Sequence, residues 1–408
     1  MHLKFNSAKH LCFYLSHPCS MTKVARGSDG SKHCDKILIG ANENGVAIIG
    51  QRDNQSYERI IPTSEFSLIQ SGAIAVESTK LLGVMRTFGD QSVELILKEN
   101  ERPSNSKENK PSYKLQVKSG RSRIHINEVV EANEVPRSNV ALKDAKSFHF
   151  SLNLLKEMIQ SVKPCLTEDC SQANMRCLQL KVSSDTISAS TVDGLRLAIA
   201  KAKLAQPYDG ELIALIPTRV VDMILSLTAE MDDCVISIAK SAMAITVGSL
   251  KFQSSLVDVR YPDLNKVMPS ETLGFAVVQA KPFIEVLERA KIAVDISTSA
   301  NNNIPSRIVI NFNTDGNLHC ESFKNANLIT EEDFLSEKIQ LKSSESLVTA
   351  FDYTFLQQAI NSMKSSMVSL TLAKNNHGNE SDPAMVLITP LDQAKPFTLM
   401  SLIMPQRT

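Results

Sequence analysis

TVDGLRLA, at residues 191–198, is the most informative stretch of this sequence, together with SSLVDVRYPDLNKVMP at 254–269 and the C-terminal LIMPQRT at 402–408. In the first stretch, Asp193-Gly194 predicts a tight hairpin turn between two strands. In the second, Tyr261-Pro262-Asp263 predicts a bend in the chain. Each signal is common by itself, so the information lies in their order and spacing.

The composition bounds the class of protein. A chain of 408 residues predicts two to three domains. Hydrophobic residues make up 43%, but Trp is absent, so the cores must consist mainly of Leu, Ile, Val and Met. Lys+Arg and Asp+Glu both number 44, which argues against a uniformly basic coat for nucleic acid, although charge can be sorted between faces. No apolar run reaches the ~18–20 residues of a membrane span. The N-terminal apolar stretch is too short for a secretory signal, so we expect a cytoplasmic protein with no membrane contact.

Internal repetition organises the chain. Segments with helical periodicity alternate with runs of strand alternation, at intervals of about 60–75 residues. The helical segments lie around 7–17, 78–88, 152–163, 218–228, 281–292 and 353–364. Six copies of a helix with about four strands predict an α+β repeat architecture. Pairs of copies predict three similar domains, at 1–140, 141–270 and 271–408.

Basic residues recur on the polar sides of these helices. In the segment 152–163, Leu155, Met158, Ile159 and Val162 form the apolar stripe, while Lys156, Gln160 and Lys163 share another face. A single lysine in such a place is most often merely solvated, but recurrence in at least five segments predicts contacts with DNA phosphates, independent of base sequence. Glu285 and Glu288 dilute the pattern in the fifth segment. The predicted DNA-facing residues are Lys80, Arg86, Lys156, Lys163, Arg219, Arg289 and Lys364.

The sequence contains no recognisable metal-binding or catalytic motif. Eight scattered cysteines form no Cys-x-x-Cys pair, and in a long chain of this kind most act as small buried hydrophobes. One group of six residues has metal-ligating side chains, but its spacing is not that of structural zinc sites; it comprises His10, Cys12, His17, Cys19, His33 and Cys34. The sequence has no Gly-rich phosphate loop, no H-E-x-x-H and no G-x-S-x-G. We therefore predict no metal, no cofactor and no catalytic residue.

With these motifs in this order, the sequence resembles the beta subunit of bacterial DNA polymerase III, the sliding clamp. That family usually shows DG-x-RLA, then a FPD or YPD segment running into V-x-P, then a chain ending in M-P-x-R. LQVKSGRSRIHI (115–126) and VESTKLLGVMRTF (76–88) resemble further family segments. The sequence departs from the family pattern around 18–36 and at Leu195, Gln406 and Thr408.

The resemblance implies the DNA clamp fold, with three similar domains of two helices on antiparallel sheets that together form half of a ring. It implies a replication processivity factor, a non-catalytic subunit whose two copies join head to tail around double-stranded DNA. The polymerase catalytic subunit and the clamp loader would bind through short hydrophobic peptides. In this sequence the family's peptide pocket corresponds to Met175, Gly194, Leu195, Arg196, Leu197, Pro262, Lys266, Val267, Asp352, Phe355, Leu402, Ile403, Met404, Pro405, Gln406 and Arg407.

The self-contact of the ring involves a hairpin of the first domain. Ile124 and Ile126 fall on one face of a predicted edge strand, and exposed apolar edge strands are normally covered. The resemblance implies that Ile292 and Ala293 of a second copy provide this cover.

Two alternatives stay open at this point. The chain could be a peptide-binding scaffold or decoy with the clamp fold that does not encircle DNA. A hydrolase whose site has no recognisable motif is a third class.

Overall fold

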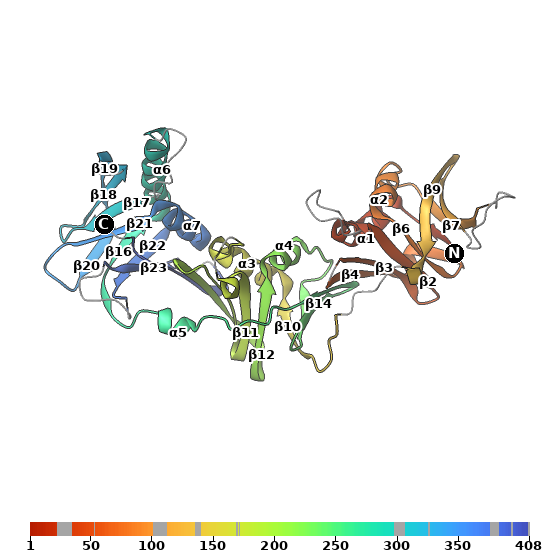
Figure 1. Cartoon of the computed structure of the whole chain (residues 1–408), viewed down its shortest axis with the longest axis horizontal. Coiled ribbons are helices and arrows are strands. Elements are labelled where there is room, and N and C mark those ends of the chain that lie inside the picture. Colours follow the sequence, from red (N-terminus) through yellow and green to blue (C-terminus); the bar gives the residue numbers. More distant parts are fainter. Residues whose placement is uncertain are drawn as a thin grey trace. The chain divides into compact units, whose positions relative to one another are not determined.

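The computed structural model describes residues 1–22, 35–52, 54–100, 112–134, 140–168, 170, 172–297, 307–324, 327–375, 383–392 and 395–406 (Figure 1). The contacts divide the chain into two compact units. The first comprises Met1–Ser151 and Leu227–Leu256, and the second comprises Leu152–Ser226 and Val257–Thr408. Neighbouring strands pair antiparallel throughout the described residues. The fold is α+β, as the sequence predicts.

The first unit is built on a thirteen-stranded sheet with the order β10-β13-β14-β15-β4-β3-β2-β6-β9-β8-β7-β1-β5. The strands are β1 (His2–Phe5), β2 (Lys36–Asn42), β3 (Gly45–Arg52), β4 (Gln55–Ile61), β5 (Phe66–Gln70), β6 (Gly72–Glu77), β7 (Val93–Glu99), β8 (Tyr113–Ser119), β9 (Ser122–Glu131), β10 (Lys146–Ser151), β13 (Asp233–Ile238), β14 (Ala242–Val247) and β15 (Leu250–Ser255). Two helices, α1 (Ala8–Met21) and α2 (Ser78–Arg86), contact each other beside this sheet (Figure 1).

The core of the first unit follows from helical spacing. Leu11 and Leu15 of α1 and Leu81 and Met85 of α2 are each four residues apart, and all four are buried in one apolar cluster. The α1 helix begins at Ser7, whose hydroxyl accepts a hydrogen bond from the backbone N–H of His10 at 3.3 Å.

The second unit contains a seven-stranded sheet, β11-β12-β24-β23-β22-β16-β20, and a four-stranded sheet, β19-β18-β17-β21. Its strands are β11 (Cys177–Val192), β12 (Arg196–Pro217), β16 (Thr272–Gln279), β17 (Arg307–Phe312), β18 (Asn317–Lys324), β19 (Asn327–Leu335), β20 (Lys338–Leu341), β21 (Leu347–Asp352), β22 (Met367–Ala373), β23 (Met385–Pro390) and β24 (Phe397–Ile403). Its helices are α3 (Leu152–Val162), α4 (Thr218–Ser226), the short α5 (Leu264–Val267), α6 (Ala280–Ser297) and α7 (Tyr353–Met363). Helices α6 and α7 lie side by side (Figure 1).

The predicted repetition is present in the order of elements. Each long helix in the described part of the chain follows a strand directly, as β1–α1, β6–α2, β10–α3, β12–α4, β16–α6 and β21–α7. All six predicted helical segments are helices. The division into three domains stays a prediction, because hydrogen-bonded pairs such as β15–β4 and β12–β24 join strands across the predicted boundaries.

Candidate peptide-binding pocket

An apolar cavity of about 260 Å³ lies in the second unit beside the β11–β12 hairpin. It is lined by Met175, Val192, Gly194, Arg196, Leu197, Pro262, Val267, Asn375, Met385, Leu402 and Met404. The three sequence motifs therefore meet at one cavity, although more than 200 residues separate the first from the last.

The hairpin turn predicted at Asp193-Gly194 is confirmed. The Asp193 carboxylate accepts hydrogen bonds from the backbone N–H groups of Leu195 at 2.9 Å and Arg196 at 3.0 Å. Gly194 has φ +94°, a conformation that favours glycine. Beyond the turn, side chains alternate in exposure, since Leu195 is 58% exposed and Leu197 only 2%. Leu197 thus faces the cavity while Leu195 faces away from the core.

Arg196 is held in a fixed position at the cavity wall. Its Nε donates to Asp193 Oδ2 at 2.8 Å, and its Nη1 donates to Gln358 Oε1 at 2.5 Å. The guanidinium carbon lies 4.0 Å from the centre of the Phe355 ring, within cation–π range. Because its side chain is only 11% exposed and forms an ion pair with Asp193, Arg196 lines the cavity without the freedom of a surface arginine.

Asp352 and Phe355 support the pocket without lining it. The Asp352 carboxylate caps α7 by accepting hydrogen bonds from the N–H groups of Thr354 at 2.8 Å and Phe355 at 3.3 Å. Burial raises the pKa of Asp352 above its ordinary value, while these hydrogen bonds and the charge of Arg196 act in the opposite direction. The cap fixes the start of the helix, and so the ring against which Arg196 stacks.

The chain's own C-terminus closes the cavity. Strand β24 pairs with β12, opposite Arg196 and Leu197. Beyond the strand, the Met404 N–H donates to the Leu195 carbonyl at 2.8 Å, and the Gln406 N–H donates to the Ala350 carbonyl at 2.8 Å. These two bonds hold Met404 against the cavity.

The segment 261–267 forms another wall. Tyr261 donates its hydroxyl proton to the Ser190 carbonyl at 3.1 Å, and burial raises the pKa of this phenol. Asp263 caps α5 by accepting from the Asn265 N–H at 3.1 Å. Pro262 and Val267 then line the cavity, whereas Lys266 is exposed and does not.

The predicted pocket residues divide into two groups. Those that line the cavity are Met175, Gly194, Arg196, Leu197, Pro262, Val267, Leu402 and Met404. Those that do not line it are Leu195, Lys266, Asp352, Phe355, Ile403, Pro405 and Gln406, and Arg407 lies outside the described residues. Sequence reasoning missed Val192, Asn375 and Met385. Val192 could have been found, because a hairpin turn at Asp193-Gly194 brings the flanking strands together, and Val192 stands opposite Leu197.

The basic helix residues carry less free charge than their number suggests. Three of the seven form ion pairs: Lys80 with Glu77 at 2.8 Å, Lys163 with Asp222 at 2.5 Å and Arg289 with Glu332 at 2.5 Å. Lys163 and Lys364 lie just beyond the ends of α3 and α7, not within them as the periodicity predicted.

The contact of Ile126 with a second copy stays a prediction, but Ile126 does not offer the exposed apolar side chain that the prediction assumed. Its side chain is 4% exposed and belongs to the core of the first unit, and Ile124 packs against the same core. Ile292, by contrast, is 56% exposed on α6, and Ala293 beside it is half-buried.

The structure describes four of the six residues in the N-terminal group of metal-ligating side chains: His10, Cys12, His17 and Cys19. In the part of the chain that the structure describes, no group of three or more His, Cys, Asp and Glu side chains is arranged to hold a metal ion. His33 and Cys34 lie outside that part. Burial raises the pKa of the Cys165 thiol to about 12 and that of Cys177 to about 11, so both are protonated at neutral pH. None of the described helices is long and apolar enough to cross a membrane.

Comparison with known proteins identifies relatives of the central region and of the whole fold. Residues 149–263 match the family described as DNA polymerase III beta subunit, central domain. The chain is 22% identical to the beta sliding clamp of Bacillus subtilis over 262 residues, which cover 63% of this chain and 66% of that protein. It is 25% identical to the beta sliding clamp of Vibrio cholerae over 240 residues, 58% of this chain and 60% of that protein. These alignments span less than two thirds of either relative.

Solved structures extend the likeness to the full length. The Bacillus subtilis DNA polymerase sliding clamp superposes with a TM-score of 0.82 at 18% identity, covering 100% of this chain and 99% of that one. A Pseudomonas aeruginosa sliding clamp bound to griselimycin superposes with a TM-score of 0.80 at 18% identity, with both chains fully covered. The chain thus has the fold of a DNA polymerase sliding clamp. Its central region, residues 149–263, matches the DNA polymerase III beta subunit family, and the chain is similar to bacterial beta sliding clamps.

Proposed function

We propose that this chain is a DNA replication processivity factor. Two copies close head to tail into a ring around duplex DNA, and the apolar pocket binds short hydrophobic peptides of the polymerase catalytic subunit and the clamp loader. The protein acts in the cytoplasm, without a cofactor and without catalysing a reaction. Its mechanism is topological, because a closed ring slides along DNA but cannot leave it sideways.

The observation that carries this proposal is the apolar pocket closed by the chain's own C-terminus. Its lining is apolar apart from Arg196 and Asn375, a composition suited to peptide anchors such as Leu and Phe. Burying two such side chains contributes roughly 3–6 kcal/mol before ordering costs. Alone this corresponds to a Kd of only about 0.04–6 mM, so these anchors give a weak contact, and tethering on DNA raises the effective concentration of the polymerase at the primer end.

The helices supply the proposed DNA contact. Sequence-independent binding needs only basic side chains that reach phosphates, and Arg86, Arg219 and Lys364 are exposed in three of the repeated units. Because Lys80 and Lys163 are already paired with carboxylates, fewer basic side chains are available and total binding is weak. Contacts with phosphates are also sensitive to salt. Encirclement turns such weak contacts into persistent attachment.

Two free sheet edges support the head-to-tail contact. Within the described chain, Ser122–Asn127 of β9 pairs on one side only, with exposed Arg121 and Arg123 at this edge. Strand β19 is the last strand of its sheet and carries Glu331 and Asp333. An edge with basic side chains and an edge with acidic ones are complementary, and each copy would supply both.

Retention on circular DNA tests the proposal. The protein is loaded onto nicked circular duplex DNA, and the complex is separated from free protein by gel filtration in high salt. We expect the protein to stay with the circle and to be released when the circle is cut once. Equal retention on circular and linear DNA, or release from both, would contradict encirclement.

A second candidate function follows from the ion pairs on the helices. If the pairs of Lys80, Lys163 and Arg289 leave too little positive charge for DNA, the chain is a peptide-binding scaffold with the clamp fold. That function predicts peptide binding without retention on the circle.

A further inference from the structure

A second, polar cavity adjoins the apolar pocket. It has a volume of about 480 Å³, and Pro262 belongs to the lining of both cavities. Its walls carry hydroxyl, amide and ammonium groups where the first cavity has methionine, valine and leucine. A ligand that extends from the apolar pocket past Pro262 would therefore meet the hydrogen-bonding side chains of this second cavity.

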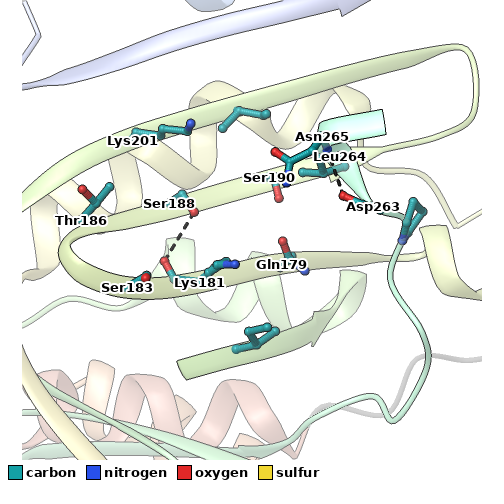
Figure 2. A pocket seen from close by; sticks show the side chains of 13 residues that line it. Gln179, Lys181, Ser183, Thr186, Ser188, Ser190, Lys201, Asp263, Leu264 and Asn265 are labelled. Carbon is teal, nitrogen blue, oxygen red and sulfur yellow. Dashed lines mark hydrogen bonds between the residues drawn. The ribbon is translucent and has the colours of Figure 1, made fainter. Parts of the chain in front are cut away.

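A bend in β11 creates this cavity. Ser184 has φ +54°, and the register with β12 shifts on both sides of it, so the strand folds back on itself. Figure 2 shows the result: Gln179, Lys181 and Ser183 on one arm face Thr186, Ser188 and Ser190 on the other. The arms are linked where the Ser188 hydroxyl donates to the Lys181 carbonyl at 3.4 Å. Asp263, Leu264 and Asn265 lie over one end (Figure 2).

Three charged side chains line this cavity: Lys181, Lys201 and Asp263. Lys181 forms an ion pair with Glu211, which does not line the cavity. Lys201 lies along the cavity, and its ammonium group has no hydrogen bond or ion pair with any described residue. The one acidic residue among the described lining residues, Asp263, has its Oδ1 engaged by the Asn265 N–H. Lys201 is therefore the one lining ammonium group without a carboxylate partner among the described residues, while Asp263 keeps its negative charge at the end of the cavity next to Asn265.

We propose that this polar cavity binds acidic residues that flank the hydrophobic anchors of a partner peptide. The proposal rests on the proposed function of the apolar pocket. Carboxylates accept hydrogen bonds from hydroxyl, amide and ammonium groups, and bonds that involve a charged partner are stronger than neutral ones. A peptide is favoured over a nucleic acid because the cavity adjoins the peptide pocket, with Pro262 in the lining of both.

The test compares peptides that differ only in flanking charge. Fluorescence anisotropy is used to titrate the full-length protein with a labelled peptide Gln-Ser-Ala-Leu-Phe, bearing Asp-Glu-Asp or Asn-Gln-Asn at its N-terminus or at its C-terminus. We expect the acidic extension at one end to lower the Kd about three- to tenfold relative to the amide extension, and the gain to shrink in high salt. A gain of less than about twofold at both ends would overturn the proposal.

Two substitutions test which lysine produces the gain in affinity from the acidic extension. Lys201→Gln is expected to abolish it while leaving the Kd of the amide-extended peptide unchanged. Lys203→Gln is the matched control, because Lys203 is also exposed, lies two residues further on the same strand and does not line the cavity. A gain that persists in Lys201→Gln, or that disappears equally in Lys203→Gln, would contradict the assignment.

The same titrations separate this proposal from the proposed function. If the amide-extended peptides bind and acidic residues add nothing, only the role of the polar cavity is refuted. If no peptide binds, the peptide pocket itself is refuted, and the cavity proposal with it. A single-stranded oligonucleotide that binds the wild type but not Lys201→Gln, with no gain from acidic peptides, would assign the cavity to nucleic acid instead.

Discussion

Gly194 holds the hairpin turn in a backbone conformation that other residues adopt only at a cost. Its φ is +94°, and an added Cβ would lie 3.7 Å from Met175 Sδ, so the cost is conformational and not steric. We expect Gly194→Ala to destabilise the protein by about 1–2 kcal/mol, because L-residues are strained in this region. Peptide binding should weaken as well, since the turn positions Arg196 and Leu197. Thermal denaturation and peptide titration measure the two effects.

Gly83 supplies the control for that substitution. It lies inside α2, and an added Cβ would meet no atom within 4 Å. Gly83→Ala should therefore stabilise the protein by about 0.5–1 kcal/mol, because alanine is the better helix former. Equal changes of the same sign in the free energy of unfolding of the two variants would show that the positive φ at Gly194 does not determine the effect of the substitution.

His319 is expected to make stability depend on pH. Its Nδ1 lies 2.7 Å from Asp333 Oδ1, and its Nε2 lies 3.5 Å from Glu331 and 3.6 Å from Glu321. The hydrogen bond with Asp333 raises the pKa of His319 above its ordinary value. A raised pKa in the folded state means that the stabilisation is complete below the unfolded-state pKa and is lost as pH rises through the folded-state pKa. His319→Gln should cost about 0.2–1 kcal/mol near pH 5.5 and almost nothing near pH 9. A cost that does not change with pH in urea denaturation would refute this.

At the scale of helices and strands, the sequence predicted the features that depend only on residues close together in the chain. The stripe of Leu155, Met158, Ile159 and Val162 predicted α3, and all four side chains are buried. The Asp-Gly pair predicted the turn between β11 and β12. The ion pair of Lys163 with Asp222 could not be predicted, because the two residues are 59 positions apart and meet only after α3 and α4 have packed. Asn375 and Met385 were missed for the same reason, since only the packed sheet brings them to the cavity.

The C-terminal segment beyond β24 is expected to serve the pocket more than the fold. Deleting Met404–Thr408 removes one cavity wall and the two backbone hydrogen bonds to Leu195 and Ala350. Strand β24 keeps its pairing with β12 and β23, so we expect a loss of only about 1–3 kcal/mol in stability. Peptide affinity should fall at least about tenfold, because an apolar anchor loses its cover. Unaltered peptide affinity in a folded truncation would show that Met404 does not close the site.

The ion pairs on the helices are expected to limit DNA affinity. In the double variant Glu77→Gln and Asp222→Asn, Lys80 and Lys163 each lose one carboxylate partner. We expect tighter binding to duplex DNA and a steeper dependence of log K on log salt, by roughly one unit for each additional phosphate that a lysine neutralises. Peptide affinity is the internal control and should not change. Unchanged or weaker DNA binding would mean that these lysines do not face DNA.

For the whole molecule, we expect the sheet edges to determine how copies associate. The sequence indicated an apolar contact at Ile124 and Ile126, but strand alternation turns both side chains into the core of the first unit. The same alternation turns Arg123 and His125 outward, next to the free backbone edge of β9. The proposed contact therefore consists of backbone edges and charged side chains, together with the exposed apolar side chain of Ile292.

Association should respond to charge reversal in a way that only a heterologous contact allows. We expect Arg123→Glu alone and Asp333→Arg alone to weaken the dimer, because each places like charges at the contact made twice in the ring. Both changes in one chain restore opposite charges across each contact, so the double variant should dimerise again. Ile292→Asp should give monomers, since a carboxylate would be buried without a partner. Sedimentation velocity at matched concentrations distinguishes the two species. A double variant no better than either single one would refute the pairing of β9 with β19, whereas an unchanged profile for Ile292→Asp would remove α6 from the contact.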